Sequence, residues 1–466
     1  MKKIAILLLA LTVLLTACGK NDGSSQQSSA TSQGQTVSSN QTESKTSDGI
    51  NNWNRLSMNW NGKLGVYSAV EPKALASGGK MTMVSGKSNY FLLTFFDYGK
   101  LDGTVLCNKP NCKHDSDACN AYFPVKGSSK ESSVLFGLND KIYVIVNGTV
   151  YAINEDGTNR SKIMQLPSKY TVQSTKTTAF LVGDKVYLEN DYLADVKMDK
   201  YGNLPADDNG SRTALFMLDI GAKTYKELYE YKTQESSQWL GINGNKAYYL
   251  YQDDFTPLQN HTQSEVDAQY NGRNTKVFAR DLGSGNRTDL LSGKSDEYDQ
   301  VILRGSALFY QNRKTGEIIR YNPESGEKKA LVSNPKTYIK FLSMDIQNNK
   351  LFYTLDYYDT DLYHKEPTDN ETCYVDIDSG KATKIGYRIS RDDGKTDTFS
   401  GFTKETCDYY ILPLKYEMGT VSGSSGYVGY DYVKATHYGK IKKQDFWSGK
   451  YDVYQISWEG DGWLLK

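Results

Sequence analysis

The sequence predicts an all-β protein folded as a single β-propeller, with seven four-stranded blades as the first choice and six or eight blades as alternatives. Aromatic residues are abundant, with 36 Tyr, 15 Phe and 6 Trp, and such side chains favour the half-buried surface of a sheet. Two turn patterns recur along the chain, which indicates a repeated unit. The 55 basic and 55 acidic residues balance, so nucleic acid is not expected as a partner.

The first element is an export signal, which we assign to residues 1–18. Three residues, Met1-Lys2-Lys3, carry positive charge, and residues 4–15 form an apolar run too short to span a bilayer of roughly 30 Å. The signal ends in Leu15-Thr16-Ala17-Cys18, which resembles the lipobox of bacterial lipoproteins. This resemblance implies that Cys18 is acylated and holds the protein on the extracytoplasmic side of the cell membrane. The alternative is an ordinary secretory peptide in which the cysteine is incidental.

The second element is a tether over residues 19–49. It consists almost entirely of Ser, Gln, Thr, Asn and Gly, a composition that cannot bury enough apolar surface to fold. A flexible chain of about 30 residues reaches a few nanometres, at roughly 5–6 Å × √n. The propeller is assigned to residues 50–466. No later apolar run is long enough to span a membrane, so the lipid is the only anchor expected.

The third element is a tight polar turn followed by a strand rich in aromatic and β-branched residues. Asn, Asp and Gly tolerate the positive φ that a two-residue hairpin needs, so each copy predicts a hairpin. The five copies are Asn139-Asp140-Lys141, Gly183-Asp184-Lys185, Gly244-Asn245-Lys246, Gly305-Ser306-Ala307 and Asn349-Lys350.

A second turn follows a strand that ends in Asp or Asn. In this turn, Gly stands at or near the fourth position after that Asp or Asn. The four clearest copies begin at Asp281, Asn322, Asp376 and Asp445. With a third strand between the two turns, each unit contains four antiparallel strands. Adding one degenerate unit at each end makes seven units of about 60 residues, which fits a propeller with insertions. A β-sandwich pair or a β-solenoid is the competing architecture.

The extra length of the units falls at one kind of connection. If the strands of a unit are A, B, C and D, the A→B and C→D turns emerge on one face, the turn face, and the B→C and D→A connections on the other, the loop face. Four enlarged segments lie at B→C, namely 191–212, 253–275, 357–371 and 417–429. Loops on a rigid scaffold often carry function, so the loop face is the candidate binding surface. Neutral drift in loop length is the alternative.

Three thiols and an imidazole lie within thirteen residues, as Cys107, Cys112, His114 and Cys119. Zn²⁺ accepts such a set in tetrahedral geometry, so a structural zinc site is one prediction. A disulfide within the cluster, as expected outside the cytoplasm, and reduced structural thiols are the alternatives. If residues 89–97 are strand C and 104–107 strand D, this loop is a D→A connection on the loop face.

The two remaining cysteines, Cys373 and Cys407, are predicted to form a disulfide, because removing Cys18 and the three cluster cysteines leaves one pair. His261, His364 and His437 stand alone in polar surroundings. No metalloprotease, serine-elbow or phosphate-loop motif occurs, so no catalytic or cofactor-binding residue is assigned.

The lipobox, the tether, repeat units such as residues 148–159 and the Cys/His stretch together resemble a family of propeller-like lipoproteins of Gram-positive gut bacteria. The resemblance covers most of the chain beyond residue 60 and implies a propeller in the cell envelope. The family brings no established activity, so no catalytic residue is transferred.

The expected function is that of a membrane-anchored, extracytoplasmic binding module that recognises an envelope protein, a peptide or a glycan through the loop face. The alternative is a cell-envelope glycan hydrolase or lyase with carboxylates at the propeller axis. Those carboxylates would lie about 60 positions apart in the chain, so one sequence does not reveal them.

Overall fold

The structure is a computed structural model that describes residues 54–56, 59–61, 65–70, 90–97, 102–125, 133–171, 177–194, 210–255, 262–333, 339–347, 349–357, 369–405, 408–421 and 430–456. The predicted signal peptide, Cys18 and the tether lie outside these residues. None of the described helices is long and apolar enough to cross a membrane.

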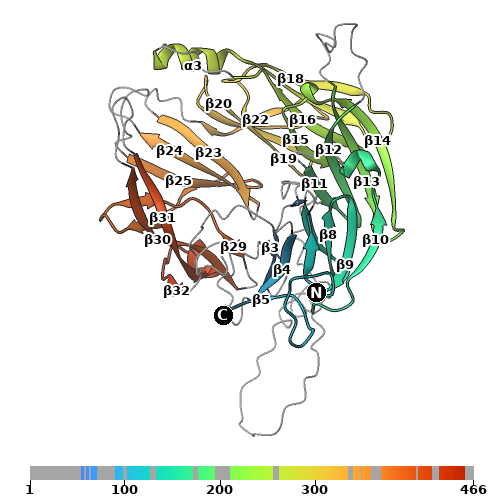
Figure 1. Cartoon of the computed structure of the whole chain (residues 1–466). Coiled ribbons are helices and arrows are strands. Elements are labelled where there is room, and N and C mark those ends of the chain that lie inside the picture. Colours follow the sequence, from blue (N-terminus) through green and yellow to red (C-terminus); the bar gives the residue numbers. More distant parts are fainter. Residues whose placement is uncertain are drawn as a thin grey trace, which may run out of the picture. The chain divides into compact units, whose positions relative to one another are not determined.

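Seven antiparallel four-stranded blades follow one another in chain order and form a β-propeller, as the sequence predicts (Figure 1). Blade 1 consists of β2 (Asn59–Asn61), β3 (Gly65–Val70), β4 (Tyr90–Asp97) and β5 (Asp102–Val105), and blade 2 of β7 (Val134–Leu138), β8 (Lys141–Val146), β9 (Thr149–Asn154) and β10 (Ser161–Gln165). Blade 3 consists of β11 (Thr177–Val182), β12 (Lys185–Leu193), β13 (Ser211–Asp219) and β14 (Thr224–Lys232), and blade 4 of β15 (Gln238–Asn243), β16 (Lys246–Gln252), β17 (Asn274–Asp281) and β18 (Arg287–Lys294).

Blade 5 consists of β19 (Asp299–Arg304), β20 (Ala307–Asn312), β21 (Glu317–Tyr321) and β22 (Lys328–Ser333). Blade 6 consists of β23 (Ile339–Gln347), β24 (Lys350–Tyr357), β25 (Asp369–Asp376) and β26 (Ala382–Lys384), and blade 7 of β29 (Lys404–Glu405), β30 (Tyr409–Val421), β31 (Tyr430–Lys442) and β32 (Tyr454–Ile456). The helical elements described are α2 (Ser168–Thr171), η2 (Thr233–Glu235), α3 (Gln263–Gly272) and α4 (Lys443–Trp447).

Apolar cores lie between consecutive blades rather than at one centre. Because neighbouring side chains of a strand point to opposite faces of its sheet, each blade contributes to two cores. Tyr248 packs against blade 5, whereas Tyr249 packs against Phe180 and Leu215 of blade 3. Both tyrosines are buried, which confirms that this pair packs between blades. Six such clusters join blades 1 through 7 in sequence among the described residues.

The predicted A→B turns are confirmed in all five copies. Val182 pairs with Lys185, so Gly183 and Asp184 alone make the turn between β11 and β12. The other four connections have the same two-residue length. Asn139 and Asp140 adopt φ values of 51° and 57°, the left-handed conformation that this kind of hairpin requires.

The C→D turns are confirmed where an Asp or Asn closes the turn with its own side chain. In blade 4, the Asp281 carboxylate accepts hydrogen bonds from the backbone N–H groups of Gly283 and Ser284 at 2.9 and 2.8 Å. Gly285 has φ 72°, and its N–H donates to the Asp281 carbonyl. The copy at Asp445 differs, because this aspartate lies inside the short helix α4.

Asp376 closes the corresponding turn in blade 6, and we expect its charge to stabilise the fold. The backbone N–H of Ser379 and the ammonium group of Lys350 lower the pKa of this carboxyl from 3.8 to about 2. Its stabilisation is therefore complete above about pH 4 and is lost as the pH falls toward 2. D376N keeps an acceptor for the turn and should cost about 1 kcal/mol at pH 7, after allowance for solvent screening. Urea unfolding should show that this cost disappears near pH 2, and a cost that stays constant with pH would contradict the assignment.

Blade 7 departs from the simple repeat. β27 (Arg388–Arg391) and β28 (Thr396–Thr398) form an additional hairpin in its sheet. β27 pairs with β30 in parallel at Ser390 and Lys415, whereas the first strand, β29, pairs with β30 at Tyr410 and Ile411. At the other end of the chain, β1 (Asn54–Arg55) does not join blade 1. It pairs instead with the first strand of blade 3, β11.

Candidate functional site

The Cys/His cluster lies in a loop that interrupts the outer strand of blade 1. β5 and β6 (Tyr122–Pro124) both pair with β4, so they are two parts of one strand D with residues 107–120 inserted between them. Leu93 of β4 closes the neck of the loop: its carbonyl accepts from Leu106 N–H, and its N–H donates to the Ala121 carbonyl, both at 2.8 Å. The predicted C and D strands are confirmed. The prediction of a D→A connection is wrong, because β6 continues strand D after the loop.

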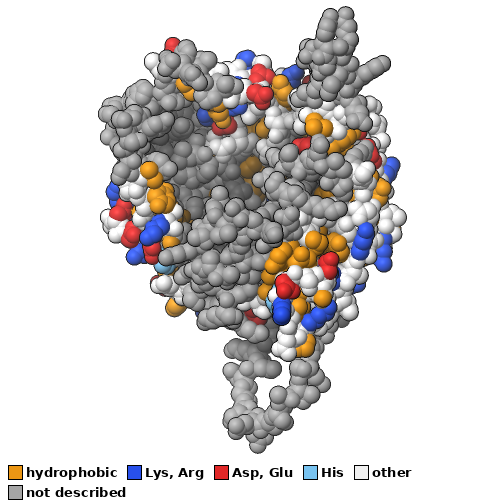
Figure 2. Space-filling model, in the orientation of Figure 1, with side chains coloured by type: hydrophobic (Ala, Val, Ile, Leu, Met, Phe, Trp, Pro, Cys, Tyr) orange, Lys and Arg blue, Asp and Glu red, His pale blue; other side chains and the backbone are white. Residues whose placement is uncertain are grey.

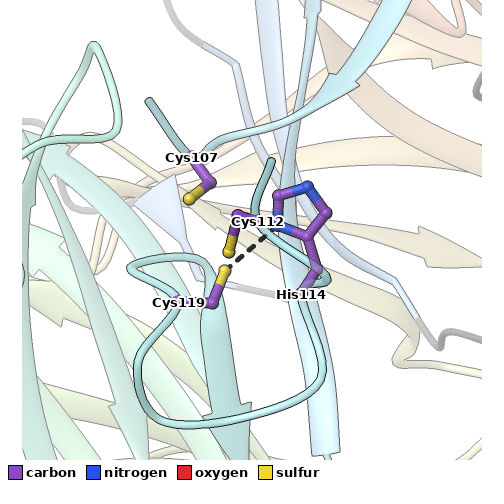
Figure 3. Close-up of side chains that lie close together, drawn as sticks. All are labelled: Cys107, Cys112, His114 and Cys119. Atoms are coloured by element: carbon purple, nitrogen blue, oxygen red, sulfur yellow. Dashed lines mark hydrogen bonds between the residues drawn. The ribbon is translucent and has the colours of Figure 1, made fainter. Parts of the chain in front are cut away.

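The loop brings the four predicted donors together (Figure 3). The ligand atoms of Cys107, Cys112, His114 and Cys119 all lie within 4.8 Å of one another. His114 Nδ1 is 3.2 Å from the Cys119 sulfur. The Cys119 side chain is buried, and the other three are half-buried. Such a group could hold a metal ion, because tetrahedral zinc with bonds of about 2.0–2.3 Å needs donors about 3.5–3.8 Å apart.

Backbone conformation aims the donors inward. Asn111 and His114 both adopt φ 56°, in the left-handed region, and these two positions bend the chain around the cluster. The Lys109 ammonium group donates to the Ala118 carbonyl and links the two sides of the loop. Cys119 N–H donates to the Ser116 carbonyl at 2.9 Å and fixes the last turn. The loop is therefore closed by its own hydrogen bonds as well as by Leu93.

Backbone N–H groups also point at the sulfurs. Burial by itself would raise the pKa of Cys107, but the N–H groups of Lys109 and Asn120 hold it below the ordinary value of 9. Burial raises the pKa of Cys119 to about 12, although the Ala121 N–H opposes this effect. Hydrogen bonds that stabilise a thiolate are the outer-shell support that metal-bound cysteines use. The surroundings of Cys107 therefore favour the thiolate, whereas a Cys119 thiolate would need the charge of a bound cation beside it.

Residues of blade 2 hold the Cys107–Cys119 loop in place through hydrogen bonds. Asn120 donates through Nδ2 to the Gly157 carbonyl at 2.9 Å. Arg160 donates to the Asp117 carbonyl at 2.8 Å and to the Tyr122 carbonyl. These blade 2 residues belong to its C→D turn, between β9 and β10. The cluster thus lies beside a turn of the turn face, and its predicted place on the loop face is wrong.

Gly157 is the closest point between the two blades. Its φ is 80°, and a Cβ added there would lie 2.8 Å from the carbonyl carbon and oxygen of Leu106, at the neck of the loop. Arg160 packs above this contact, with its guanidinium 5.5 Å from the centre of the Phe123 ring and 5.9 Å from that of Tyr151. The arginine side chain is only 14% exposed. The loop is therefore an integral part of the blade 1/2 interface.

Cys373 stands apart from the cluster. It forms no disulfide with another described cysteine, and it packs in the core between blades 5 and 6, whereas the next residue, Tyr374, packs against blade 7. Burial raises its pKa to about 11. Cys407 lies outside the described residues, in the chain between β29 and β30 of blade 7. Their disulfide stays a prediction, and Cys373 faces the side of its sheet away from blade 7.

The single histidines carry no further site among the described residues. His437 Nε2 lies 2.7 Å from a carboxylate oxygen of Glu417, which makes a surface pair on the β30–β31 hairpin. His261 and His364 are outside the described residues.

The long connections lie at B→C, as predicted. They join β12 to β13, β16 to β17, β24 to β25 and β30 to β31, although the flanking strands extend several residues into the predicted loops. The structure adds a fifth in blade 1, where residues 71–89 join β3 to β4. That connection was missed because the degenerate first unit contains no clear turn pattern.

One of these connections contains the helix α3, which sequence analysis also missed. Its start has a readable signal, a capping box in which Thr262 and Glu265 bond each other's backbone N–H groups. Two segments hold the other end. Arg313, which follows β20 of blade 5, donates to the Asn271 side chain at 2.9 Å, and the hydroxyl of Ser295, which follows β18 of blade 4, donates to the Tyr270 carbonyl. Arg273 stacks on the Tyr270 ring at 4.0 Å. The helix is thus an ordered feature of the loop face.

No family model and no curated protein matches this chain. Solved structures with a similar fold include an oligogalacturonate lyase in complex with manganese, with 12% identity, a TM-score of 0.33, and coverage of 61% of this chain and 68% of that one. Another is a puromycin hydrolase S511A mutant complexed with PGG, with 10% identity, a TM-score of 0.44, and coverage of 87% and 54%. TolB from Acinetobacter baumannii has 11% identity, a TM-score of 0.28, and coverage of 80% and 79%. Similarities this low bear on the fold alone.

Proposed function

We propose that the protein is a lipid-anchored, extracytoplasmic binding module whose loop face recognises an envelope protein, a peptide or a glycan. Cys18 carries the lipid in this proposal, and residues 19–49 connect it to the propeller. The observation that carries the proposal is the asymmetry between the two faces of the ring. All five predicted A→B turns have two residues, whereas five long connections are B→C connections and therefore lie on the loop face. The turn face has one long connection among the described blades, residues 443–453 of blade 7, which contain α4.

The asymmetry supports recognition because binding residues are found disproportionately on loops that a rigid scaffold positions. One long connection carries α3, and that helix is anchored by Arg313 of blade 5 and by Ser295, which follows the last strand of blade 4. Fixing a connection in advance reduces the entropy lost on binding, so an anchored helix suits a binding surface better than a free loop. The loop face offers such a preorganised element beside blades 4 and 5.

We further propose that the Cys107–Cys119 loop holds a structural Zn²⁺. Three thiolates and one imidazole would complete a tetrahedral shell and leave no open position for water or substrate, which favours a structural over a catalytic role. The contacts of Asn120 and Arg160 with blade 2 support a role in joining blades 1 and 2. The loop interrupts the outer strand of blade 1 and lies beside the C→D turn of blade 2.

Shortening the long connections should abolish binding without unfolding the propeller. Two variants, one lacking residues 195–209 and one lacking 256–272, are compared with the unchanged chain on arrays of defined cell-wall glycans and peptides. We expect each deletion to weaken binding to the positive probes by at least about tenfold, which corresponds to about 1.4 kcal/mol. Thermal unfolding of both variants should remain cooperative.

The matched control alters the opposite face by exchanging Gly183-Asp184 for Asn-Gly, another two-residue turn sequence, and should bind as the unchanged chain does. Binding that survives both deletions would refute the assignment of the loop face. Release of shortened products from the arrayed glycans would instead support the alternative, a glycan hydrolase or lyase.

A further inference from the structure

We propose that the propeller is held with its turn face toward the membrane and its loop face away from it. The inference rests on the proposed lipid anchor at Cys18 and adds the direction in which the binding surface points. Its basis is the place where the chain joins the described propeller. That place is β1, which pairs with the first strand of blade 3 rather than with its own neighbours in blade 1.

The pairing of β1 has a definite polarity. Asn54 lies opposite Leu181 and Arg55 opposite Phe180, in antiparallel register, and Leu56 N–H then donates to the Ala179 carbonyl at 2.8 Å. β11 runs toward the Gly183-Asp184 turn, so β1 runs away from it. Asn54 is therefore at the turn end of β11, and the chain moves from there toward the loop face.

Leu56 fixes this segment against the propeller. It is only 5% exposed and packs in the core between blades 2 and 3. Burial of a leucine side chain contributes about 1.5–3 kcal/mol, enough to hold a short strand that has only a few backbone hydrogen bonds. Everything that precedes Asn54, including the proposed anchor, must reach the propeller at this point.

The chain joins the propeller nearer to the turn face than to the loop face. At about 3.3 Å per residue, Asn54 lies roughly 7 Å from the Gly183-Asp184 turn, whereas the end of β12 on the loop face lies roughly 23 Å away in the opposite direction. As a random coil, the roughly 35-residue tether predicted between Cys18 and Asn54 would have a root-mean-square length of roughly 30–35 Å. A membrane at the turn face would leave nearly all of that length free, whereas a membrane at the loop face would use roughly 23 Å of it, so the turn-face orientation costs the tether less conformational entropy.

This orientation narrows the class of partner. A loop face that points away from the bilayer can meet a wall-attached polymer, a secreted peptide or a protein on another surface. A partner embedded in the same membrane with little mass outside it is disfavoured. The Cys107–Cys119 loop, beside a turn of blade 2, would lie on the membrane-facing side.

Energy transfer from the protein to the membrane tests the orientation. The lipidated full chain is bound to phosphatidylglycerol/phosphatidylethanolamine vesicles that contain a rhodamine-labelled lipid. A donor dye is attached through an azide-bearing residue at Asp184 or, in a second variant, at Leu193. Both positions are exposed and lie at opposite ends of the second strand of blade 3. With the two ends about 30 Å apart, transfer from position 184 should exceed transfer from position 193 about twofold or more.

The outcomes separate the two proposals. Equal transfer from both positions, or stronger transfer from position 193, would overturn the orientation while leaving the anchor intact. Binding to vesicles that persists unchanged in C18S, or no binding by the unchanged chain, would overturn the lipid anchor and this inference with it. Stronger transfer from position 184, together with loss of vesicle binding in C18S, would support both.

Discussion

Replacing Cys119 with serine is expected to remove the proposed zinc ion and to destabilise the blade 1/2 interface. The Cys119 sulfur is the most buried of the four donors and lies against His114 Nδ1. A serine hydroxyl is a poor zinc ligand and would leave three donors around the ion. If free zinc stands at about 1,000 times its dissociation constant, loss of binding removes about 4 kcal/mol of stability. Metal analysis and thermal unfolding, each with and without a chelator, measure the two effects.

C373S is the matched control, because it makes the same chemical change at a buried thiol outside the cluster. It should retain one zinc per chain, and its unfolding should remain sensitive to the chelator. A metal content near zero in the unchanged chain, with two more titratable cluster thiols after reduction than before, would replace the zinc site with a disulfide. Full metal content in C119S would exclude Cys119 as a ligand.

Replacing Gly157 with alanine should separate the Cys107–Cys119 loop from blade 2. The added Cβ would lie 2.8 Å from the Leu106 backbone, and that backbone cannot move without opening the neck of the loop. The left-handed conformation costs an alanine about 1–2 kcal/mol, and overpacking adds about 1–3 kcal/mol. We therefore expect a loss of about 3 kcal/mol in the free energy of unfolding, together with weaker zinc binding.

G183A separates conformational strain from the inter-blade contact. Gly183 has φ 62°, but an added Cβ would have nothing within 4 Å. G183A should lower the free energy of unfolding by about 1 kcal/mol and leave the zinc affinity unchanged. Equal losses for the two variants, or a G157A protein with unaltered zinc affinity, would show that the contact between Gly157 and Leu106 does not support the metal centre.

The fold could be predicted from the sequence because the patterns that define its turns lie within a few neighbouring residues. Gly183-Asp184 and its counterparts define two-residue hairpins by their own backbone preferences, and Asp281 closes a turn with its own side chain. Blade 7 carries no comparable signal for the parallel pairing of β27 with β30. That pairing joins residues 25 positions apart through backbone groups that every residue has. Likewise, nothing in Asn54 or Arg55 indicates pairing with blade 3.

The donor set was also local, because four ligating residues within thirteen positions are close in any fold. The surroundings of the cluster, in contrast, depend on residues that are distant in the chain. Tyr122–Pro124 is too short a segment to identify as the second half of strand D, so the loop was assigned to the wrong connection. The roles of Gly157 and Arg160 depend on the packing of blade 2 against blade 1, and their sequence neighbours are those of an ordinary C→D turn.

The most direct test of a metal centre that joins two blades is X-ray absorption at the zinc edge on the purified full chain. We predict a shell of three sulfurs at about 2.3 Å and one nitrogen at about 2.0–2.1 Å, which is lost in C119S and preserved in C373S. A protein without zinc whose cluster sulfurs are bonded to each other, or a zinc shell dominated by oxygen, would contradict the account.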